Sequence, residues 1–274
     1  MSAQVAAEFM AKSKKSALNM IDTHAHMLPG VDHGSPDLET TMRMLREAAA
    51  QGVETVVCTP HLYELDARLV ERAHEVHEEV KIELQKAAIP IRLLLGFEVD
   101  STVAVTADDD TLRGLTIEGS ERSLLVEMPY NGWPLYLEQT VFRLSAAGFL
   151  PILAHPERNE RVQHSPDVLT ACLNAGAIVQ GTAGSLSSMF RRQSLKTFHE
   201  LLGRGWFSLL ASDAHSQPEY TWTVVPLLAD LGKRVSPEGR ELLTRVNPAR
   251  VLAGQRPLPV PVERPSRSRR FKLR

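Results

Sequence analysis

Histidines and carboxylates occur along this sequence in short clusters whose residue types and spacing suit metal binding. One cluster is Asp22-Thr-His24-Ala-His26, and another is Asp213-Ala-His215. Imidazole and carboxylate without thiolate favour borderline or hard divalent ions such as manganese, iron or zinc. Two or more such ions held close together can activate water and stabilise the charge of a hydrolytic transition state. The candidate metal ligands are His24, His26, His61, Glu98, Glu127, His155, Asp213 and His215.

These residues follow short apolar runs that are typical of β-strands, and helical patterns separate the runs. The predicted strands are residues 18–22, 54–59, 91–97, 123–126, 150–154, 177–181 and 206–211. The predicted helices include residues 37–50, 67–88, 136–147 and 186–202. Because the carboxyl ends of parallel barrel strands lie on one face, residues that follow these strands would converge there. The sequence therefore predicts an α/β fold, a single-domain distorted (β/α)7 barrel with a metal site at the C-terminal ends of its strands.

The two ends of the chain differ in composition from its body. Residues 1–19 are predicted to be a loose extension and residues 20–254 the barrel domain. Residues 255–274 hold four prolines and seven Lys or Arg against one Glu, so they are expected to form a basic, disordered tail.

Charge and composition exclude several functions. The formal net charge of the whole chain is −2, and because both ends are positive, the net charge of residues 20–254 is near −10. A domain with this negative charge offers a poor surface for binding nucleic acid. No apolar run is long enough for a membrane span. Cys58 and Cys172 are the two cysteines, too few for a disulfide framework, so a reducing cytoplasm is the expected location. The oligomeric state stays open.

In their order and strand positions, the motifs resemble the polymerase and histidinol phosphatase (PHP) superfamily. The likeness is closest to the bacterial manganese-dependent protein-tyrosine phosphatases linked to capsule and exopolysaccharide synthesis, and it runs from about Met20 to about Gly254. The motifs that carry it are Ile-Asp-Thr-His24-Ala-His26, Leu-Pro-Gly-Val-Asp32-His33-Gly34, Cys-Thr-Pro-His61, Gly-Phe-Glu98, Leu-Val-Glu127, Ala-His155-Pro-Glu-Arg158, Ala-Ser-Asp213-Ala-His215 and Asn-Pro-Ala-Arg-Val-Leu near residue 250.

The resemblance implies a PHP-type barrel that hydrolyses phosphotyrosine on protein. The implied substrate is a bacterial tyrosine kinase of polysaccharide export, and the implied cofactors are three divalent ions per site, with manganese favoured over iron or zinc. The resemblance implies three sets of ligands. The first ion would be held by His24, His26, Glu98 and Asp213. Glu98 would also hold a second ion together with Glu127 and His155, and a third ion would be held by His61 and His215. Arg158 would bind phosphate, while His33 and His215 are candidate proton donors.

Two departures from the family pattern affect these expectations. His33 stands where relatives usually have a second aspartate, so it is expected to ligate a metal or donate a proton. The stretch 216–220 lacks the second arginine that relatives carry there, and Arg191 or Arg192 is the candidate replacement.

Three other functions compete with this interpretation. One is a small-molecule phosphatase acting on a compound like histidinol phosphate. Another is an amidohydrolase, although no lysine follows a predicted strand where that class carries one. The third is a metal-stabilised regulatory protein of low turnover. Cysteine-based phosphatase chemistry is excluded, because neither Cys58 nor Cys172 is followed by arginine six residues later.

Five more positions carry open expectations. Asp22 either orients a ligand or caps its strand. Tyr130 and Trp133 follow Glu127 and either stack on an aromatic ester or pack their loop. His74 and His77 are expected to be solvated on their helix.

Overall fold

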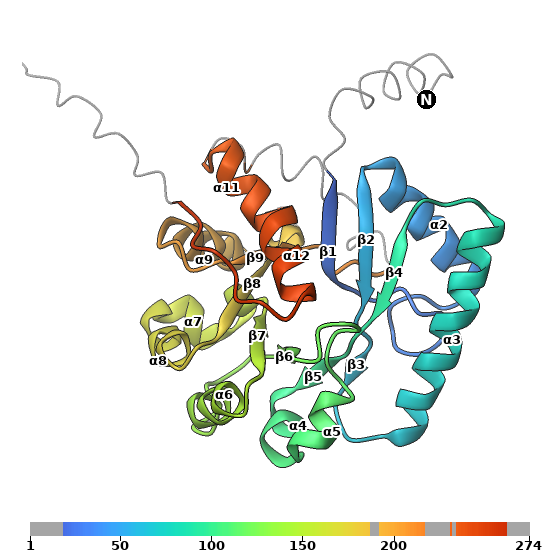
Figure 1. Ribbon diagram of the computed structural model, residues 1–274. Helices are drawn as coiled ribbons and strands as arrows, with labels where there is room; N and C mark the ends of the chain where they lie inside the picture. The colour runs from blue at the N-terminus through green and yellow to red at the C-terminus, as the bar shows by residue number, and fades with distance from the viewer. Residues whose placement is uncertain (1–18, 187–191, 217–230, 232–233, 262–274) are drawn as a thin grey trace, which may run out of the picture.

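The computed structural model describes residues 19–186, 192–216, 231 and 234–261. All strand pairs in these residues are parallel, and they form two sheets (Figure 1). The first sheet has the order β1-β2-β4 and comprises β1 Met20–Ala25, β2 Val53–Cys58 and β4 Arg92–Leu95. The second has the order β3-β5-β6-β7-β8-β9 and comprises β3 His61–Leu62, β5 Glu98–Asp100, β6 Ser123–Glu127, β7 Leu150–Ala154, β8 Ile178–Thr182 and β9 Leu209–Ala211.

Two short strands were not predicted from the sequence. The predicted strands 54–59 and 91–97 correspond to β2 and β4, and after a break each is followed by a further strand, β3 or β5. Pro60 has no N–H to donate to a ladder, which accounts for the first break. The pieces stay in line, because Gly96 N donates to Cys58 O at 2.9 Å and Glu98 N donates to Pro60 O at 3.1 Å.

The two sheets meet between β1 and β9. A bridge pairs Ala25 with Ala214, His26 N donates to Ala214 O at 2.9 Å, and Asp213 N donates to His24 O at 2.9 Å. Asp22 strengthens this junction by accepting hydrogen bonds from the amide and the hydroxyl of Ser212. The carboxyl ends of strands from both sheets therefore lie together.

Helices pack outside the strands (Figure 1). The described helices are α2 Leu38–Ala50, α3 Ala67–Lys86, α4 Ser101–Thr106, α5 Asp109–Arg113, α6 Leu137–Ala146, α7 Glu160–His164, α8 Leu169–Asn174, α9 Arg192–Gly203, α11 Pro237–Glu241 and α12 Asn247–Leu252. α2 and α3 begin as their sequences predict, since Asp37 and Asp66 accept hydrogen bonds from amides of the first helical turn. A π-helical turn, Leu242–Val246, joins α11 to α12.

The inner side of the strands holds a separate apolar core. Six strands contribute to it, namely β2 with Val57, β4 with Leu94, β6 with Leu125, β7 with Leu150, Ile152 and Ala154, β8 with Ile178 and β9 with Leu209. Val251 of α12 packs against this cluster. A larger core lies between the strands and the outer helices.

His77 was expected to be solvated, and this prediction is wrong. Its exposed fraction is 2%, whereas His74 on the same helix is exposed. The buried face of α3 consists of Ala73, Val76, His77, Val80 and Leu84. His77 falls on this stripe of three- and four-residue spacing, so helix periodicity outweighs its polarity.

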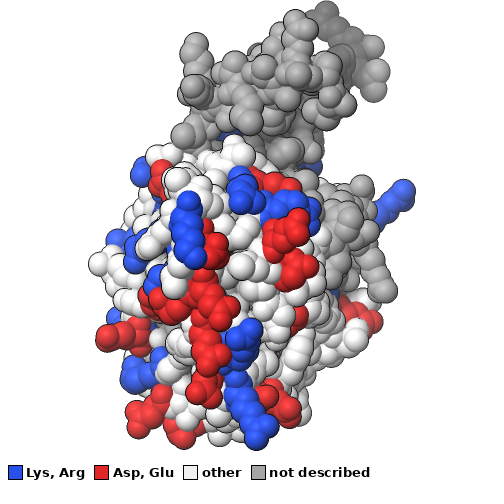
Figure 2. Space-filling view, turned by 90° about the vertical axis from the view of Figure 1, so that its right-hand side faces the viewer, with Lys and Arg blue, Asp and Glu red and all other residues white. Residues whose placement is uncertain are grey.

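The face that includes α3 carries acidic and basic side chains intermixed (Figure 2). Arg72 pairs with Glu75, Lys81 with Glu78, and Lys86 with Glu83. On this face, the described residues show no concentrated positive charge of the kind that binds nucleic acid. None of the described helices is long and apolar enough to cross a bilayer.

The first residues after α12 lie against the barrel. Asn247 exchanges hydrogen bonds with Leu258, Arg256 donates to Gly176 O at 3.1 Å, and Val260 packs against the core. The tail expected from residue 255 is therefore anchored over residues 255–261. Residues 262–274 and 1–18 lie outside the described residues.

Candidate metal centre

Strand periodicity explains why the ligand candidates face inward. Successive side chains of a strand alternate between its faces, so His24 and His26 share one face of β1. Leu125 of β6 lies in the inner core, and Glu127, two residues later, lies on the same side at the strand end. Apolar residues thus fill the base of the strands and ligand types occupy their carboxyl ends.

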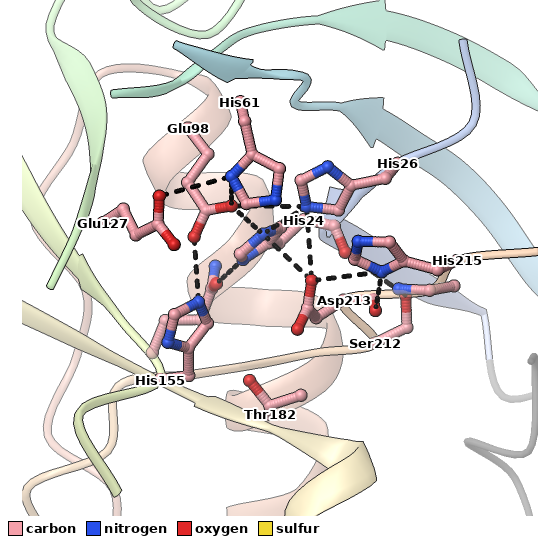
Figure 3. Close-up of polar contacts among 12 residues, drawn as sticks. His24, His26, His61, Glu98, Glu127, His155, Thr182, Ser212, Asp213 and His215 are labelled. Atoms are coloured by element: carbon pink, nitrogen blue, oxygen red, sulfur yellow. Dashed lines mark hydrogen bonds and ion pairs between the residues drawn. The ribbon is translucent and has the colours of Figure 1, made fainter. Parts of the chain in front are cut away.

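Four side chains converge around the end of β1 (Figure 3). The Nε2 atoms of His24 and His26 are 3.0 Å apart. Glu98 Oε2 lies 3.1 Å from the first and 3.3 Å from the second. Asp213 Oδ1 lies 3.4 Å and 3.2 Å from the same two atoms. Two ring nitrogens and two carboxylate oxygens therefore point at a common centre.

Glu98 connects this centre to a second group. Its Oε1 lies 2.9 Å from His155 Nε2, and its Oε2 lies 3.1 Å from His61 Nδ1. Glu127 Oε2 lies 3.3 Å from the same nitrogen of His61. All these side chains are buried.

A third group is made of imidazoles. The ring of His26 stacks on those of His61 and His215 with centroids 4.3 and 4.2 Å away. His33 stacks on His61, and its Nε2 lies 3.2 Å from His215 Nε2. The structure therefore brings all nine candidate ligands together, and His33 is the one with an exposed side chain.

The chemistry of this donor set fits divalent cations. Ligand atoms lie within 4.8 Å of one another in four overlapping groups: His26, His61 and His215; His24, His26 and Asp213; His24, Glu98 and His155; and His61, Glu98 and Glu127. Among the described residues, His61 Nδ1, Glu98 Oε2 and Glu127 Oε2 are buried without a hydrogen-bond partner. Unpaired buried polar atoms are costly, and a cation would satisfy them.

The ionisation states agree with this fit. Burial opposes ionisation of Glu98 and Asp213, but the charge of His24 beside the first and of Arg158 beside the second hold both pKa values well below their usual range. Burial, together with the nearby charge of His26, lowers the pKa of His215 to about 4. The site therefore offers ionised carboxylates and, at His215, a neutral imidazole.

Two partners of the ligands were not predicted from the sequence. Asp32 Oδ2 lies 2.7 Å from His26 Nδ1, and Gln180 Oε1 lies 2.8 Å from His24 Nδ1. Each contact holds the ring so that its Nε2 faces the common centre. The position of Asp32 within the His26–Gly34 motif was a usable signal, whereas nothing in the sequence marks Gln180.

Two of the clustered residues have left-handed backbone conformations. His155 follows β7 directly with φ 34°, and Asp213 follows β9 by two residues with φ 55°. Such conformations cost about 1 kcal/mol or more in residues other than glycine and are concentrated at functional sites. At His155, the turn directs the ring toward Glu98.

Arg158 lies at the same centre. It ends the 3-10 turn Pro156–Arg158, its exposed fraction is 9%, and its Nη1 donates to Asp213 Oδ2 at 2.6 Å. Arg192 is exposed at the start of α9 and does not line the pocket, described below, into which Arg158 projects. Arg191 and the 217–220 part of the stretch that lacks a second arginine lie outside the described residues.

A pocket of about 390 Å³ opens at the metal centre. Its lining residues are His33, His61, Tyr63, Tyr130, His155, Arg158, Asp213 and His215. Tyr130 lines this pocket, while Trp133 packs against the core, so the two aromatics have different roles. Tyr63 was not predicted from the sequence, although it lies two residues after His61.

The remaining sequence candidates do not point into the cluster of ligand side chains. Asp22 joins β1 to β9 through Ser212 and accepts a hydrogen bond from the backbone amide of His24, not from its ring, which fits a structural role. Cys58 and Cys172 are buried, and burial raises the pKa of both thiols, that of Cys172 to about 12. Neither cysteine is a thiolate nucleophile at neutral pH.

Fold and site together define an α/β protein with a buried cluster of histidines and carboxylates suited to several metal ions. The chain belongs to the CpsB/CapC family of capsular polysaccharide synthesis, whose profile matches residues 20–253. It is 32% identical over 253 residues to the tyrosine-protein phosphatase YwqE of Bacillus subtilis (strain 168), covering 89% of this chain and 97% of that protein. It is also 32% identical over 200 residues to the putative tyrosine-protein phosphatase CapC of Staphylococcus aureus. That match covers 72% of this chain and 77% of CapC.

Solved structures agree with this assignment. One chain from crystal structures of YwqE from Bacillus subtilis and CpsB from Streptococcus pneumoniae, described as unique metal-dependent tyrosine phosphatases, superimposes with a TM-score of 0.78 at 29% identity. It covers 89% of this chain and 100% of the other. A probable 2-pyrone-4,6-dicarboxylic acid hydrolase from Acinetobacter baumannii, at 16% identity and a TM-score of 0.51, covers 86% of this chain and 99% of the other and shares the fold alone.

Proposed function

We propose that this protein is a metal-dependent protein-tyrosine phosphatase of capsular or exopolysaccharide synthesis. The observation that carries the proposal is the cluster of overlapping ligand groups around one pocket, with Arg158 in the pocket wall. Divalent ions activate water, and arginine binds phosphate oxygens, so this combination suits phosphomonoester hydrolysis. Relatives named tyrosine-protein phosphatases support the substrate class.

We propose that the fold is a PHP-type distorted (β/α)7 barrel. If β2 with β3, and β4 with β5, each count as one interrupted strand, seven strand positions run around the molecule. The parallel pairs and the β1–β9 bridge support this interpretation.

We propose three divalent ions, with manganese favoured over iron or zinc. His24, His26 and Asp213 would hold one ion, Glu98 would bridge to a second held with Glu127 and His155, and His61 and His215 with His33 would hold the third. The proximity of His61 to Glu98 and Glu127 supports a continuous cluster. When bound, the ions would supply Lewis acidity that activates water and neutralises phosphate charge.

The side chains of this protein would perform the remaining steps. Burial opposes the charge of Arg158, but the carboxylate of Asp213 beside it raises the pKa of Arg158 above its usual range and holds it protonated. Its guanidinium could therefore bind two phosphoryl oxygens and stabilise charge that develops there. His33, at the pocket wall, would give a proton to the departing oxygen if it does not hold an ion, whereas the low pKa of His215 suits that residue to metal binding and not to the proton-donor role expected for it. A phenol has a pKa near about 10, so a tyrosine leaving group needs less of this help than an alkyl alcohol.

The proposed substrate is phosphotyrosine on a bacterial tyrosine kinase of polysaccharide export. Two buried, unpaired thiols support a cytoplasmic location, where such a kinase domain would be dephosphorylated.

The test is elemental analysis of the purified protein combined with a substrate panel of phosphotyrosine peptide, phosphoserine peptide and histidinol phosphate. Chelation should abolish turnover, and manganese should restore it better than magnesium, since imidazole-rich sites favour transition ions. Replacement of both cysteines by alanine should leave turnover unchanged.

Three other outcomes would contradict the proposal. Full activity after exhaustive chelation would contradict the metal mechanism. A preference for histidinol phosphate would favour a small-molecule phosphatase, and the absence of turnover on all substrates would favour a regulatory protein.

A further inference from the structure

Two half-exposed tyrosines stand on the pocket wall. Tyr63 follows β3 and Tyr130 follows β6, and their exposed fractions are 57% and 50%. Tyr63 stacks on His61 with ring centroids 4.9 Å apart and planes at 14°. Tyr130 faces His155 at 6.0 Å and 9°. Each ring therefore lies nearly parallel to the imidazole of a candidate metal ligand.

Core packing does not account for these two rings. Trp133, in the same loop as Tyr130, packs against the large core, but neither tyrosine belongs to the buried or partly buried residues of the described cores. Large aromatic faces exposed beside a polar site are typical of ligand-binding surfaces.

The loop of Tyr130 is attached to the turn that bears Arg158. Asn159 Nδ2 donates to Pro129 O at 2.6 Å and to Gly132 O at 2.9 Å, and Glu160 N donates to Tyr130 O at 2.8 Å. Asn159 is buried, with 1% exposed, and it directly follows Arg158. These hydrogen bonds thus attach the loop of the aromatic ring to the turn of the arginine.

Resting on the phosphatase function proposed above, we propose that Tyr63 and Tyr130 form an aromatic slot that selects aryl over alkyl phosphomonoesters, with Asn159 as a positioning residue for Tyr130. An aryl ester with phosphorus at the metal centre extends a flat ring between the two tyrosines. Aromatic pairs gain energy beyond their buried area, and an alkyl ester offers no such ring.

The experiment compares kcat/KM for phosphotyrosine and phosphoserine peptides of one sequence, using metal-loaded protein. The aryl-to-alkyl ratio should fall about tenfold in the Tyr63→Ala/Tyr130→Ala double variant, as expected for the loss of two aromatic contacts. Phenylalanine at both positions should preserve the ratio. Phe142→Ala removes an exposed aromatic of α6 outside the pocket and serves as the control.

Asn159→Asp tests the positioning role separately. The variant keeps the oxygen that accepts from Val162 N but loses both donations to the Tyr130 loop. The ratio should fall as in Tyr130→Ala, and combining the two changes should lower it no further. A merely structural role would reduce turnover of both peptides equally.

The outcomes separate the two proposals. A wild-type protein without phosphatase activity in the presence of metal would overturn the proposed function. An active protein whose ratio is unchanged in the double tyrosine variant would overturn the slot while leaving the phosphatase function intact.

Discussion

Arg158 lies beside the ligand side chains and cannot itself be a ligand. It contacts Asp213, lines the pocket and stays protonated, and a guanidinium has no lone pair for a metal. Asp32 and Gln180 are not ligand candidates either, but they contact the rings of His26 and His24 and orient them. The resemblance to the family pointed to Arg158, whereas the two orienting partners required the three-dimensional structure.

We predict that Arg158→Ala keeps its metals but lowers kcat/KM by about two orders of magnitude, since a charge-assisted bidentate contact made in the transition state contributes roughly 3 kcal/mol. Arg158→Lys should recover part of this loss, because ammonium keeps the charge but not the planar fork. Elemental analysis and steady-state kinetics check both statements. His155→Ala should lose metal together with activity, and a wild-type rate in Arg158→Ala would refute the phosphate-binding role.

At the scale of elements, loops between strand and helix control the site. The segment from β1 to α2 returns across the metal centre, and Gly34 lies against His26. A Cβ on Gly34 would stand 2.2 Å from His26 O and 2.4 Å from His26 Cβ, distances that no backbone tolerates. Glycine is therefore required here by close approach.

We predict that Gly34→Ala displaces His26 and lowers metal content and turnover together. Gly203→Ala is the matched control, because a Cβ at this helix end meets no atom within 4 Å. Metal content by elemental analysis and thermal unfolding in the presence of metal check the pair. Equal metal content in both variants would show that the β1–α2 loop can move away from His26.

His77 supplies an element-scale prediction about pH. Burial lowers the pKa of His77 below its ordinary value, so on acidification the unfolded chain takes up a proton before the folded chain does. Stability should therefore fall as the pH drops through about 6.5 and below. In His77→Leu this contribution disappears, so the free energy of unfolding in urea should decline less on acidification. His74→Leu, at an exposed position of α3, is the control, and equal pH slopes in all three proteins would contradict the assignment.

At the scale of the whole molecule, the ring of strands is joined at β1 and β9 and covered by the helices that precede residue 255. The segment 255–261 adds to this cover through Arg256, Leu258 and Val260. The composition of residues 255–274 predicted one disordered tail, because proline and charge dominate the average. The contacts of Arg256, Leu258 and Val260 depend on the part of the folded chain against which they lie, and composition does not describe that surface.

We predict different effects for two truncations. Removal of residues 262–274 should leave stability and hydrolysis of a small aryl phosphate unchanged. Removal of residues 255–274 should also leave the metal site intact but lower the melting temperature, since Asn247 would lose both hydrogen bonds to Leu258. Loss of metal in either truncated protein would mean that the tail belongs to the site.

The sequence by itself determined the ligand types, the α/β class and the common edge at which the ligands gather. These follow from local rules, because strand periodicity decides which side chains face inward and parallel strands share one carboxyl end. The tertiary structure decided which nitrogen faces which oxygen, how Asp32 and Gln180 orient the rings, and that Tyr63 joins Tyr130 at the pocket. Such contacts join residues far apart in the chain, as in the case of His24 and Gln180. The distances between such residues depend on the register of the strands and on how the two sheets are joined. All elements contribute to that arrangement, so no local sequence pattern encodes it.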